Sequence, residues 1–517
     1  MRQRSQPFLL HDTLLLKSAE TPDKPAVVVE GKPYSYAQLA DQVCRLANAL
    51  QARGFQRGDR VAIYMDNTWP CVISIYATLL AGGVFLVVNP QTKADKLEFI
   101  LNDSDARFLL TDSHLANTFV PLLPQLVNLI CTICSGKALD QPGIEFFDGV
   151  LVTADNTTPA EINNPLDLAA LIYTSGSTGN PKGVMQTHQS MLFAASSLIE
   201  YLRLTASDKI LCVLPVAFDY GLYQLLMSIK LGATLVLERS FTFPAQIFAR
   251  MEEQGVTVFP GVPTIFAMLL SIHGREALSF PNITRITNTA AALPDDFVPR
   301  LREIFPNALI YRMYGLTECK RVSYLEPELA HEFPGSVGKA IPGTEVYLLS
   351  AEGAPVPAGE TGILYVRGPH VMLGYWKQPE LSARMLKPGK FPGERVLCTQ
   401  DFFRMDEQGF LYFVGRNDDI IKTRGEKVSP VEVENAMHAI PGIREVAVVG
   451  VADDVLGQAV RAYVVLHPDV TLTDKQIRLQ CMARLENFMV PRDIVICADL
   501  PKTTTGKVSK KLLLEED

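Results

Sequence analysis

Hydrophobic and polar positions along the first 160 residues follow two different periods. Apolar side chains recur at helical spacing over residues 36–52, and residues 60–65 form a short β-branched run that predicts a strand. The same patterns predict further helices and strands at 69–81, 84–88, 96–104 and 106–110. Strands that alternate with helices are typical of βαβ units, so we expect a parallel sheet with helices on both faces.

The alternation continues through the central region and predicts a second α/β layer. A strand over 168–173 leads into a stretch rich in glycine, serine and threonine, and a helical pattern begins near residue 190. This strand–loop–helix order is the one that an anion site at a helix N-terminus needs. Further elements are predicted at 209–214, 220–230, 233–237, 245–254, 256–259 and 263–270.

The pattern changes twice in the second half of the chain. Between residues 335 and 412 the predicted strands are short and glycines are frequent, which indicates a small β-barrel-like unit. After the charged segment 415–419 a compact α+β module begins, with elements at 430–438, 446–451, 459–466 and 474–485. We predict an α/β protein in which a large domain, 1–414, is joined by a hinge to a small mobile domain, 415–517.

Composition and charge narrow the possible functions. The chain has 517 residues, and its net charge of −8 disfavours a nucleic-acid surface. Nine scattered cysteines give no disulfide framework, so we expect a reducing, cytoplasmic location and favour ordinary thiols for the C-x-x-C of Cys131 and Cys134. The most apolar run, 72–88, is cut by Gly82 and Gly83, so it predicts a buried helix and a buried strand rather than a membrane span.

One stretch, residues 172–183, concentrates hydroxyls and glycines ahead of a lysine. Glycines let the backbone approach a ligand, and consecutive N–H groups in such a turn form a concavity for anions. A polyphosphate is therefore the ligand that this loop suits. The spacing of its residues matches neither a Walker A loop nor the G-x-G-x-x-G motif. The alternative interpretation is that the segment is only a flexible connection. The residues assigned to the anion are Thr174, Ser175, Gly176, Ser177, Thr178, Gly179 and Lys182.

A second segment carries groups that a nucleotide needs. Tyr314, Thr317 and Glu318 lie within five residues, so they offer a ring for a base, a hydroxyl for a phosphate and a carboxylate for Mg²⁺. Taken alone, the segment is better explained as an ordinary strand end.

Four more residues are candidates towards the C-terminus. Asp401 is suited either to accept hydrogen bonds from ribose hydroxyls or to cap a turn. Arg416 and Lys422 flank the predicted hinge and are assigned to the nucleotide. Lys507 follows a glycine near the end of the chain, where a lysine is normally just a solvated charge.

In this order and at these separations, the motifs resemble those of the acyl-adenylate-forming superfamily, which includes acyl-CoA synthetases, peptide-synthetase adenylation domains and beetle luciferases. The resemblance extends from about Leu14 to Lys510. It rests on five motifs, at 172–183, 314–318, 399–401, 415–422 and 506–507. The chain departs from the family at Gln400, where the family usually has glycine.

The resemblance implies a two-step reaction. A carboxylate attacks the α-phosphorus of ATP to give an acyl-AMP and pyrophosphate, and a thiol of CoA or of a carrier protein's phosphopantetheine then displaces AMP. Glu318 and the loop would hold Mg²⁺ and the phosphates, and Lys507 would bridge the attacking carboxylate and the α-phosphate. By the same resemblance, Tyr314 would stack on adenine, Thr317 would contact phosphate, and Asp401 would hold the ribose. Arg416 would help to fix the ribose or the phosphate. Asp418 would be the hinge, and Gly425 would line the pantetheine tunnel.

The acid is expected to bind near Asp219. Amino-acid-activating members of the family carry aspartate at this position, paired with the substrate ammonium, which points to an acid with an amino group. Alternatively Arg321 pairs with Asp219 and leaves an apolar site for a fatty or aromatic acid, since a buried charge needs a partner. The bulk of Tyr220 and Tyr223 favours a short or flat acid. The other residues expected at this pocket are Pro260, Thr289, Met313 and Val322.

We therefore predict an AMP-forming acid–thiol ligase for a small amino or aryl acid, dependent on ATP and Mg²⁺. The thiol acceptor, CoA or a carrier protein, stays open. Segment 424–430 looks more like the corresponding loop of acyl-CoA ligases than that of peptide synthetases. Stand-alone enzymes that load a carrier protein in trans can have a similar loop. The alternatives are a fatty or medium-chain acyl-CoA synthetase, a luciferase-like oxygenase and a non-catalytic protein of the same fold. Neither a nucleic-acid partner nor a transmembrane segment is expected.

Overall fold

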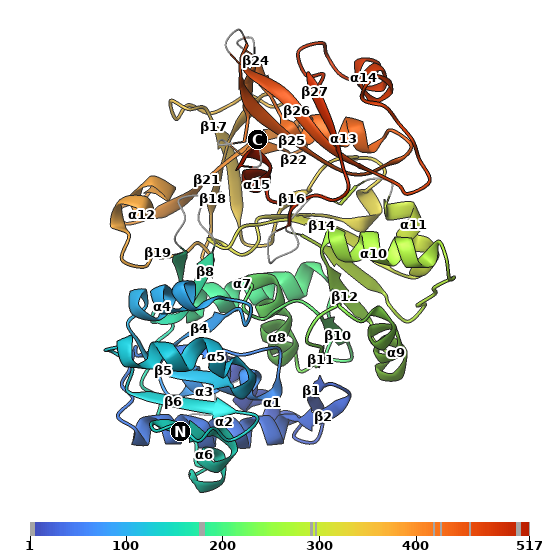
Figure 1. Cartoon of the computed structure of the whole chain (residues 1–517). Helices are drawn as coiled ribbons and strands as arrows, with labels where there is room; N and C mark the ends of the chain where they lie inside the picture. Colours follow the sequence, from blue (N-terminus) through green and yellow to red (C-terminus); the bar gives the residue numbers. More distant parts are fainter. Residues whose placement is uncertain are drawn as a thin grey trace.

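Four β-sheets organise the chain from its N-terminal to its C-terminal end (Figure 1). The computed structural model describes residues 6–174, 181–289, 293–294, 297–416, 419–423, 426–453, 456–502 and 508–515. Two large α/β layers form the N-terminal part, a smaller sheet follows, and a separate α+β module ends the chain. The predicted α/β class is confirmed.

The first sheet has eight strands in the order β19-β9-β8-β4-β3-β5-β6-β7. All neighbours from β8 to β7 run parallel, whereas β9 and β19 add an antiparallel edge. The strands are β3 (Arg60–Tyr64), β4 (Val84–Val88), β5 (Ala106–Asp112), β6 (Cys131–Ser135), β7 (Ile144–Phe146), β8 (Leu168–Thr174), β9 (Lys182–Thr187) and β19 (Gly374–Tyr375).

The second sheet has nine strands in the order β16-β15-β14-β13-β12-β10-β11-β1-β2, and its central strands are also parallel. They are β1 (Pro25–Val29), β2 (Lys32–Ser35), β10 (Lys209–Cys212), β11 (Thr234–Leu237), β12 (Val258–Gly261), β13 (Arg285–Asn288), β14 (Leu309–Tyr314), β15 (Ser323–Leu325) and β16 (Lys339–Ala340).

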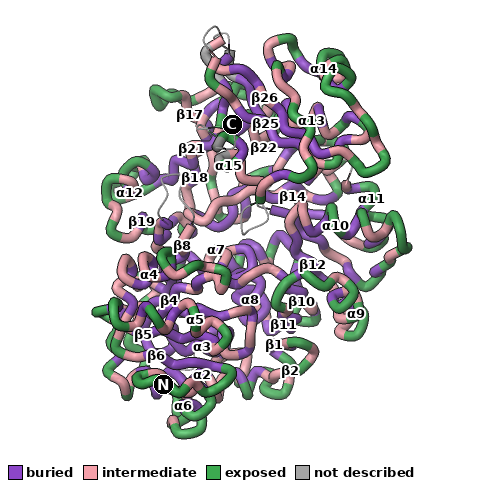
Figure 2. The backbone as a smooth tube through the Cα atoms, viewed as in Figure 1, coloured by how far each residue is buried: buried purple, intermediate pink, exposed green. Residues whose placement is uncertain are grey.

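Helices cover both sheets on both faces, as predicted. One apolar core lies between the sheets and includes α1 (Leu10–Glu20), α2 (Tyr36–Ala52), α3 (Trp69–Leu80), α7 (His188–Tyr201) and α8 (Asp219–Leu231). The outer faces are covered by α4 (Ala94–Asp103), α5 (Ala116–Phe119), α9 (Pro244–Gln254), α10 (Pro263–His273) and α11 (Phe297–Ile304). Figure 2 shows this interior as a continuous buried region.

Local sequence explains why several of these elements begin and end where they do. Ser35 caps α2 by accepting the Gln38 N–H, while the Gln38 side chain accepts the Ser35 N–H. Helix α8 ends at Gly232, whose φ of +79° is the left-handed conformation of a helix C-terminus. Segment 72–88 is the buried end of α3 and strand β4, and none of the described helices is both long and apolar enough to cross a bilayer.

The third sheet is antiparallel and stands where the barrel-like unit was predicted. Its strands are β17 (Glu345–Leu349), β18 (Thr361–Arg367), β20 (Leu386–Pro388), β21 (Arg395–Met405) and β22 (Leu411–Arg416), with α12 (Pro379–Met385) beside them.

The C-terminal module is a fourth sheet with its own core. Its elements are β23 (Ile421–Thr423), β24 (Glu426–Val428), α13 (Pro430–His438), β25 (Ile443–Asp453), β26 (Gly457–Leu466), α14 (Asp474–Met482), β27 (Asp493–Cys497) and α15 (Lys510–Glu515). The predicted boundary after residue 414 falls two residues before the end of β22.

The context expected for the Ser/Thr/Gly-rich loop was wrong. Residues 182–187 form strand β9, which pairs with β8 in the register Thr174–Lys182, so the loop joins two antiparallel strands rather than a strand and a helix. Helix α7 begins only at His188, behind its own cap at Thr187. The strand was missed because glycine and glutamine hide its alternation, and pairing with β8 and β19 stabilises it.

Candidate active site

The turn between β14 and β15, residues 315–322, carries much of the predicted site. It follows a parallel strand at its carboxyl end, the edge where α/β sheets bind ligands. The Val322 N–H closes the turn by donating to the Tyr314 carbonyl over 3.0 Å. A Cβ at Gly315 would lie 2.4 Å from the Lys320 carbonyl oxygen, so only glycine suits that position. Lys320 has a φ of +61°, an uncommon conformation for a side-chain-bearing residue.

The nucleotide-side residues meet on one side of this turn. The Tyr314 hydroxyl donates to Asp401 Oδ2, and the Tyr314 ring lies 4.7 Å from the Phe403 ring at 68°. Arg416 Nε lies 3.8 Å from Asp401 Oδ1. The structure therefore brings together three residues that the sequence assigned to adenine and ribose.

Burial tunes the carboxyl group of Asp401. The residue is almost fully buried, and this burial raises its pKa to about 6, against the opposing effects of the Tyr314 hydrogen bond and the Arg416 charge. The preceding Gln400 has a φ of +60°, where glycine is favoured. This backbone conformation gives a physical reason for the glycine that the family usually has at this position.

The phosphate-side residues gather around Tyr375. Thr174 and Lys182 face each other across the β8–β9 pair. Lys182 Nζ lies 5.9 Å from the centre of the Tyr375 ring, and the Tyr375 hydroxyl donates to Glu318 Oε1 over 2.6 Å. The base of the loop and the carboxylate assigned to Mg²⁺ thus share one neighbour.

Gln186 and Tyr375 were missed from the sequence. Gln186 Nε2 donates to the Thr317 carbonyl over 3.2 Å, which ties β9 directly to the turn. Their strands, β9 and β19, pair with each other although they lie far apart in the sequence, so no short motif marks the two residues. A polar residue in an otherwise buried strand, as Gln186 is in β9, was the available signal.

The structure corrects the expected partner of Asp219. Lys320 Nζ lies 3.4 Å from Asp219 Oδ2, and no ion pair joins Asp219 to Arg321 in the part of the chain that the structure describes. Lys320 is 4% exposed, and its ammonium lies 4.6 Å and 5.4 Å from the ring centres of Tyr223 and Tyr220. Lys320, whose backbone is left-handed, meets the Asp219 carboxylate, whereas Arg321 reaches α8 at the Tyr220 ring.

Arg321 instead lies deep in the protein. It is 1% exposed, Nη1 donates to Thr289 Oγ1, and the guanidinium carbon lies 5.7 Å from the Tyr220 ring centre. Met313 is buried and its sulfur accepts a hydrogen bond from Tyr201. Of the remaining pocket candidates, Pro260 lies in β12 and Val322 is buried at the end of the turn.

Several predicted site residues lie outside the described residues. They are Ser175, Gly176, Ser177, Thr178, Gly179, Asp418, Gly425 and Lys507. Lys422 lies in β23, where its backbone is paired with that of Lys427. The roles of these residues remain predictions.

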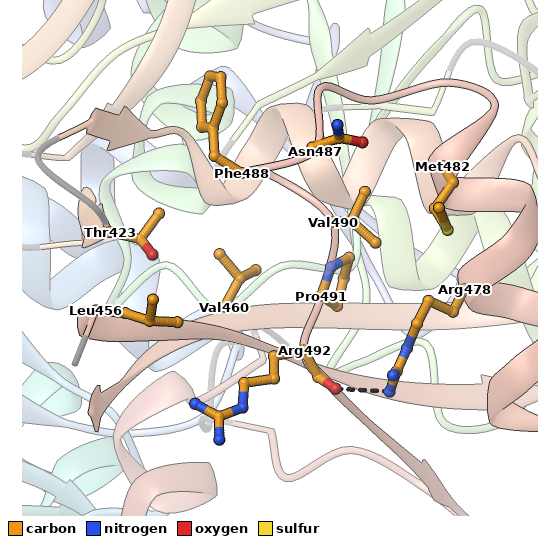
Figure 3. A pocket seen from close by; sticks show the side chains of 10 residues that line it. All are labelled: Thr423, Leu456, Val460, Arg478, Met482, Asn487, Phe488, Val490, Pro491 and Arg492. Carbon is orange, nitrogen blue, oxygen red and sulfur yellow. Dashed lines mark hydrogen bonds between the residues drawn. The ribbon is translucent and has the colours of Figure 1, made fainter. Parts of the chain in front are cut away.

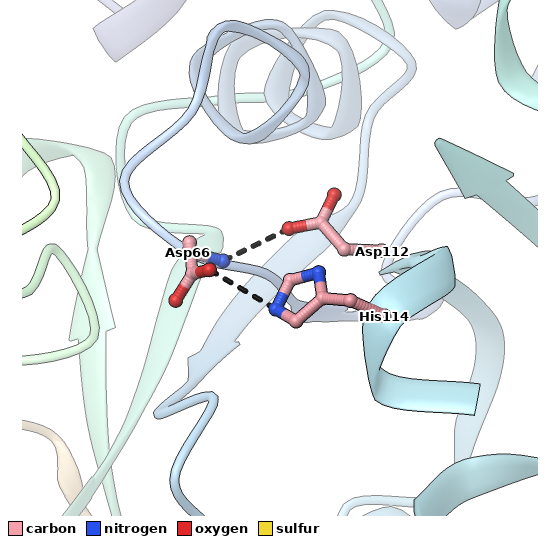
Figure 4. Close-up of side chains that lie close together, drawn as sticks. All are labelled: Asp66, Asp112 and His114. Carbon is pink, nitrogen blue, oxygen red and sulfur yellow. Dashed lines mark hydrogen bonds and ion pairs between the residues drawn. The ribbon is translucent and has the colours of Figure 1, made fainter. Parts of the chain in front are cut away.

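Two other features lie away from the turn. His114 Nε2 lies 3.1 Å from Asp66 Oδ2, and the Asp66 N–H donates to Asp112 over 3.1 Å (Figure 4). Because these groups are partnered with one another, we assign the cluster a structural role at the ends of β3 and β5. A cavity of about 260 Å³ lies beside α14, and at its edge Arg478 donates to the Arg492 carbonyl (Figure 3).

Comparison with known proteins identifies the family. Residues 16–376 match the model of the AMP-binding enzyme, and residues 432–507 match that of the AMP-binding enzyme C-terminal domain. The chain belongs to the AMP-binding enzyme family. This membership confirms the resemblance inferred from the five motifs, and with it an AMP-forming acid–thiol ligase that depends on ATP.

Relatives of this AMP-binding enzyme act on unlike acids. The chain is 31% identical to a long-chain-fatty-acid–CoA ligase of Bacillus subtilis (98% of this chain, 94% of the relative) and to an oxalate–CoA ligase of Arabidopsis thaliana (96% of each). Its fold matches an anthranilate CoA ligase crystallised with anthranoyl-AMP, with a TM-score of 0.91, 26% identity and coverage of 100% and 99%. The comparisons therefore establish the chemistry and leave the acid open.

Proposed function

We propose that this enzyme activates a compact carboxylic acid as its acyl-AMP at the end of β14 and the turn 315–322 that follows it. The main support for this proposal is that this one segment contacts three groups of residues. Tyr314 meets Asp401, Glu318 meets Tyr375, and Lys320 meets Asp219. Nucleotide, phosphates and acid would thereby converge on a single rigid segment, which supports a reaction between the acid and ATP.

In the first step, a carboxylate oxygen of the acid attacks the α-phosphorus of ATP. The bond from the α-phosphorus to the bridging oxygen breaks, and pyrophosphate leaves. Positioning and charge stabilisation carry most of such a reaction. We assign adenine to Tyr314, the ribose to Asp401 and Arg416, the phosphates to Thr174, residues 175–179, Lys182 and Thr317, a further nucleotide contact to Lys422, and the attacking carboxylate and α-phosphate to Lys507.

Glu318 is the residue that would hold Mg²⁺. Its Oε1 accepts from Tyr375, whereas Oε2 has no hydrogen-bond partner among the described residues, and a free carboxylate oxygen is the ligand that Mg²⁺ prefers. When bound, the ion would neutralise charge on the phosphates. Lys182, near the same tyrosine, would add a second positive charge to that region.

In the second step, a thiolate attacks the acyl carbonyl carbon, the bond to the phosphate oxygen breaks, and AMP leaves. We assign Asp418 as the hinge between a domain of residues 1–414 and one of 415–517, and Gly425 as the lining of the thiol tunnel. Because β22 ends at Arg416 and β23 begins at Ile421, the chain passes between two sheets here. The acceptor is CoA, or the phosphopantetheine of a carrier protein supplied in trans.

The acid pocket supports a compact substrate. Tyr220 and Tyr223, which are 6% and 2% exposed, occupy the first turn of α8 beside Asp219. Asp219 already has a counter-charge in Lys320, so it no longer argues for an amino group on the acid.

We place the enzyme in a reducing compartment, the cytoplasm. None of the nine cysteines forms a disulfide, and seven of them are buried. Buried thiols that form no disulfide are typical of proteins from reducing compartments.

A screen of pyrophosphate release from ATP tests the proposal. Amino, aryl, fatty and dicarboxylic acids are supplied singly, and the best acid is then combined with CoA or with a carrier protein. Release that depends on an acid, followed by thioester formation with one thiol, is the expected result. Pyrophosphate release that no acid stimulates would refute it.

A further inference from the structure

The acid side of the turn carries more buried positive charge than negative charge. Lys320 and Arg321 are 4% and 1% exposed, and Asp219 is the one carboxylate paired with either of them in the described part of the chain. Burying a charge without a counter-charge is strongly unfavourable. The described residues supply no further anion to balance this charge, so the region is suited to an anionic ligand.

Arg321 is the cation that lacks a carboxylate. Its Nη1 donates to the neutral Thr289 hydroxyl, and its buried Nε has no hydrogen-bond partner. A guanidinium presents its donors in a planar fork that matches a carboxylate. An arginine that is buried and only partly bonded is thus prepared for an anionic ligand.

Lys320 adjoins this arginine and reinforces it. Its left-handed backbone and its contacts with the faces of Tyr220 and Tyr223 hold the ammonium at the first turn of α8. Burial lowers the pKa of Lys320 to about 7, although Asp219 acts in the opposite direction. An anion bound nearby would favour the charged ammonium again.

The reacting carboxylate does not account for Arg321. Tyr314 and Arg321 leave the turn towards different neighbours. Tyr314 contacts Asp401 and Phe403 of β21, where the nucleotide is assigned, whereas Arg321 contacts Thr289 after β13 and Tyr220 of α8. The reacting carboxylate must reach the nucleotide, so a separate group has to meet the guanidinium.

We propose that the acid carries a second anionic group, a carboxylate, which Arg321 and Lys320 bind while the first carboxylate reacts with ATP. This inference rests on the proposed acid-activating function and narrows its substrate to dicarboxylic acids. A monocarboxylic acid would leave the Arg321 charge buried and unpaired. Sites of this kind reject ligands that lack the matching polar group.

The test compares matched acids on the intact enzyme. Pyrophosphate release is measured with malonate, succinate, glutarate and phthalate, each against its monoamide, which is nearly isosteric but lacks the second charge. Benzoate, butyrate, decanoate and the common amino acids complete the panel. We expect at least one dicarboxylate to exceed its monoamide in kcat/KM by about 100-fold or more.

Two variants connect the preference to the arginine. Arg321→Gln should reduce the ratio of diacid to monoamide to below about tenfold, and Arg321→Lys should retain part of it. If Arg321→Gln fails to fold, the same ratio is measured with Lys320→Gln. We expect this variant also to lower the ratio of diacid to monoamide activity.

The outcomes separate the inference from the function beneath it. Equal rates with diacids and monoamides, or a preference for a monocarboxylic or amino acid, would overturn the inference and leave the proposed function standing. Failure of every acid to release pyrophosphate would overturn the proposed function, and the inference with it.

Discussion

The hydroxyl of Tyr314 donates a hydrogen bond to the carboxylate of Asp401, although 87 residues separate them. This bond joins the turn after β14 to the antiparallel sheet that contains β21. It fixes an aromatic ring beside a buried carboxylate, the two groups assigned to adenine and ribose. The bond therefore holds the two residues of the nucleotide side in a fixed relative position.

Asp401→Asn tests the ribose assignment through pH. Because burial raises the pKa of Asp401 to about 6, the ionised carboxylate falls about tenfold between pH 7 and pH 5. The KM for ATP of the native enzyme should rise by about this factor over the same interval, measured by pyrophosphate release. The Asn variant should have a high KM that changes little with pH; a parallel rise in both proteins would contradict the assignment.

The same shift has a consequence for stability. The folded-state pKa lies above the ordinary value of 3.8, so Asp401 contributes stability at low pH that is lost as the pH rises through about 6. Asp401→Asn should therefore unfold at a higher temperature than the native enzyme at pH 7, in the absence of ATP. The difference should shrink towards pH 4, and a variant that is less stable at pH 7 would count against this account.

Asp219→Asn leaves Lys320 without its counter-charge. Since the pair is internal to the protein, we expect adenylation to fall by a similar factor, about tenfold or more, for every acid that the enzyme accepts. Selective loss for acids with an amino group would instead show that Asp219 binds a substrate ammonium. Tyr223→Phe, which keeps the charges, is the matched control.

Gly315→Ala tests the rigidity of the turn. The new Cβ would meet the Lys320 carbonyl at 2.4 Å, so the backbone must shift and the residues on both sides of it must move. Adenylation should fall by about 100-fold or more. Gly149→Ala, in a helix where the nearest atom to the new Cβ is 3.8 Å away, should leave the rate unchanged.

Lys507→Ala separates the two half-reactions. Acyl-AMP formation should fall by about 100-fold or more, while thioester formation from preformed acyl-AMP should stay near the native rate. Lys502→Ala, which removes a cation paired with Glu445 at 2.9 Å, is the control and should affect neither step. Equal loss of both steps would refute the role assigned to Lys507.

Local patterns in the sequence were sufficient for most of the fold. Helices α2 and α13 and strand β4 have the predicted bounds because capping, periodicity and flanking turns agree there. Strand β9 was missed because its stability comes from pairing, with the preceding β8 on one side and the distant β19 on the other, rather than from a clear local alternation.

The site shows the same division. Motifs located Tyr314, Glu318 and Asp401, since a nucleotide imposes fixed chemistry at fixed separations. They did not reveal that Lys320 rather than Arg321 pairs with Asp219, because that choice depends on one left-handed residue in the turn. The sequence therefore predicted which residues the nucleotide side uses, but it did not predict which cation pairs with Asp219.

The most direct test of the central claim is acid-dependent conversion of ATP to AMP and pyrophosphate by the purified chain. With an acid present, together with CoA or a carrier protein that bears a free phosphopantetheine thiol, the account predicts equal amounts of AMP, pyrophosphate and thioester. With the acid omitted, pyrophosphate release should stop. Formation of ADP and phosphate, or AMP release that is indifferent to the acid, would contradict the account.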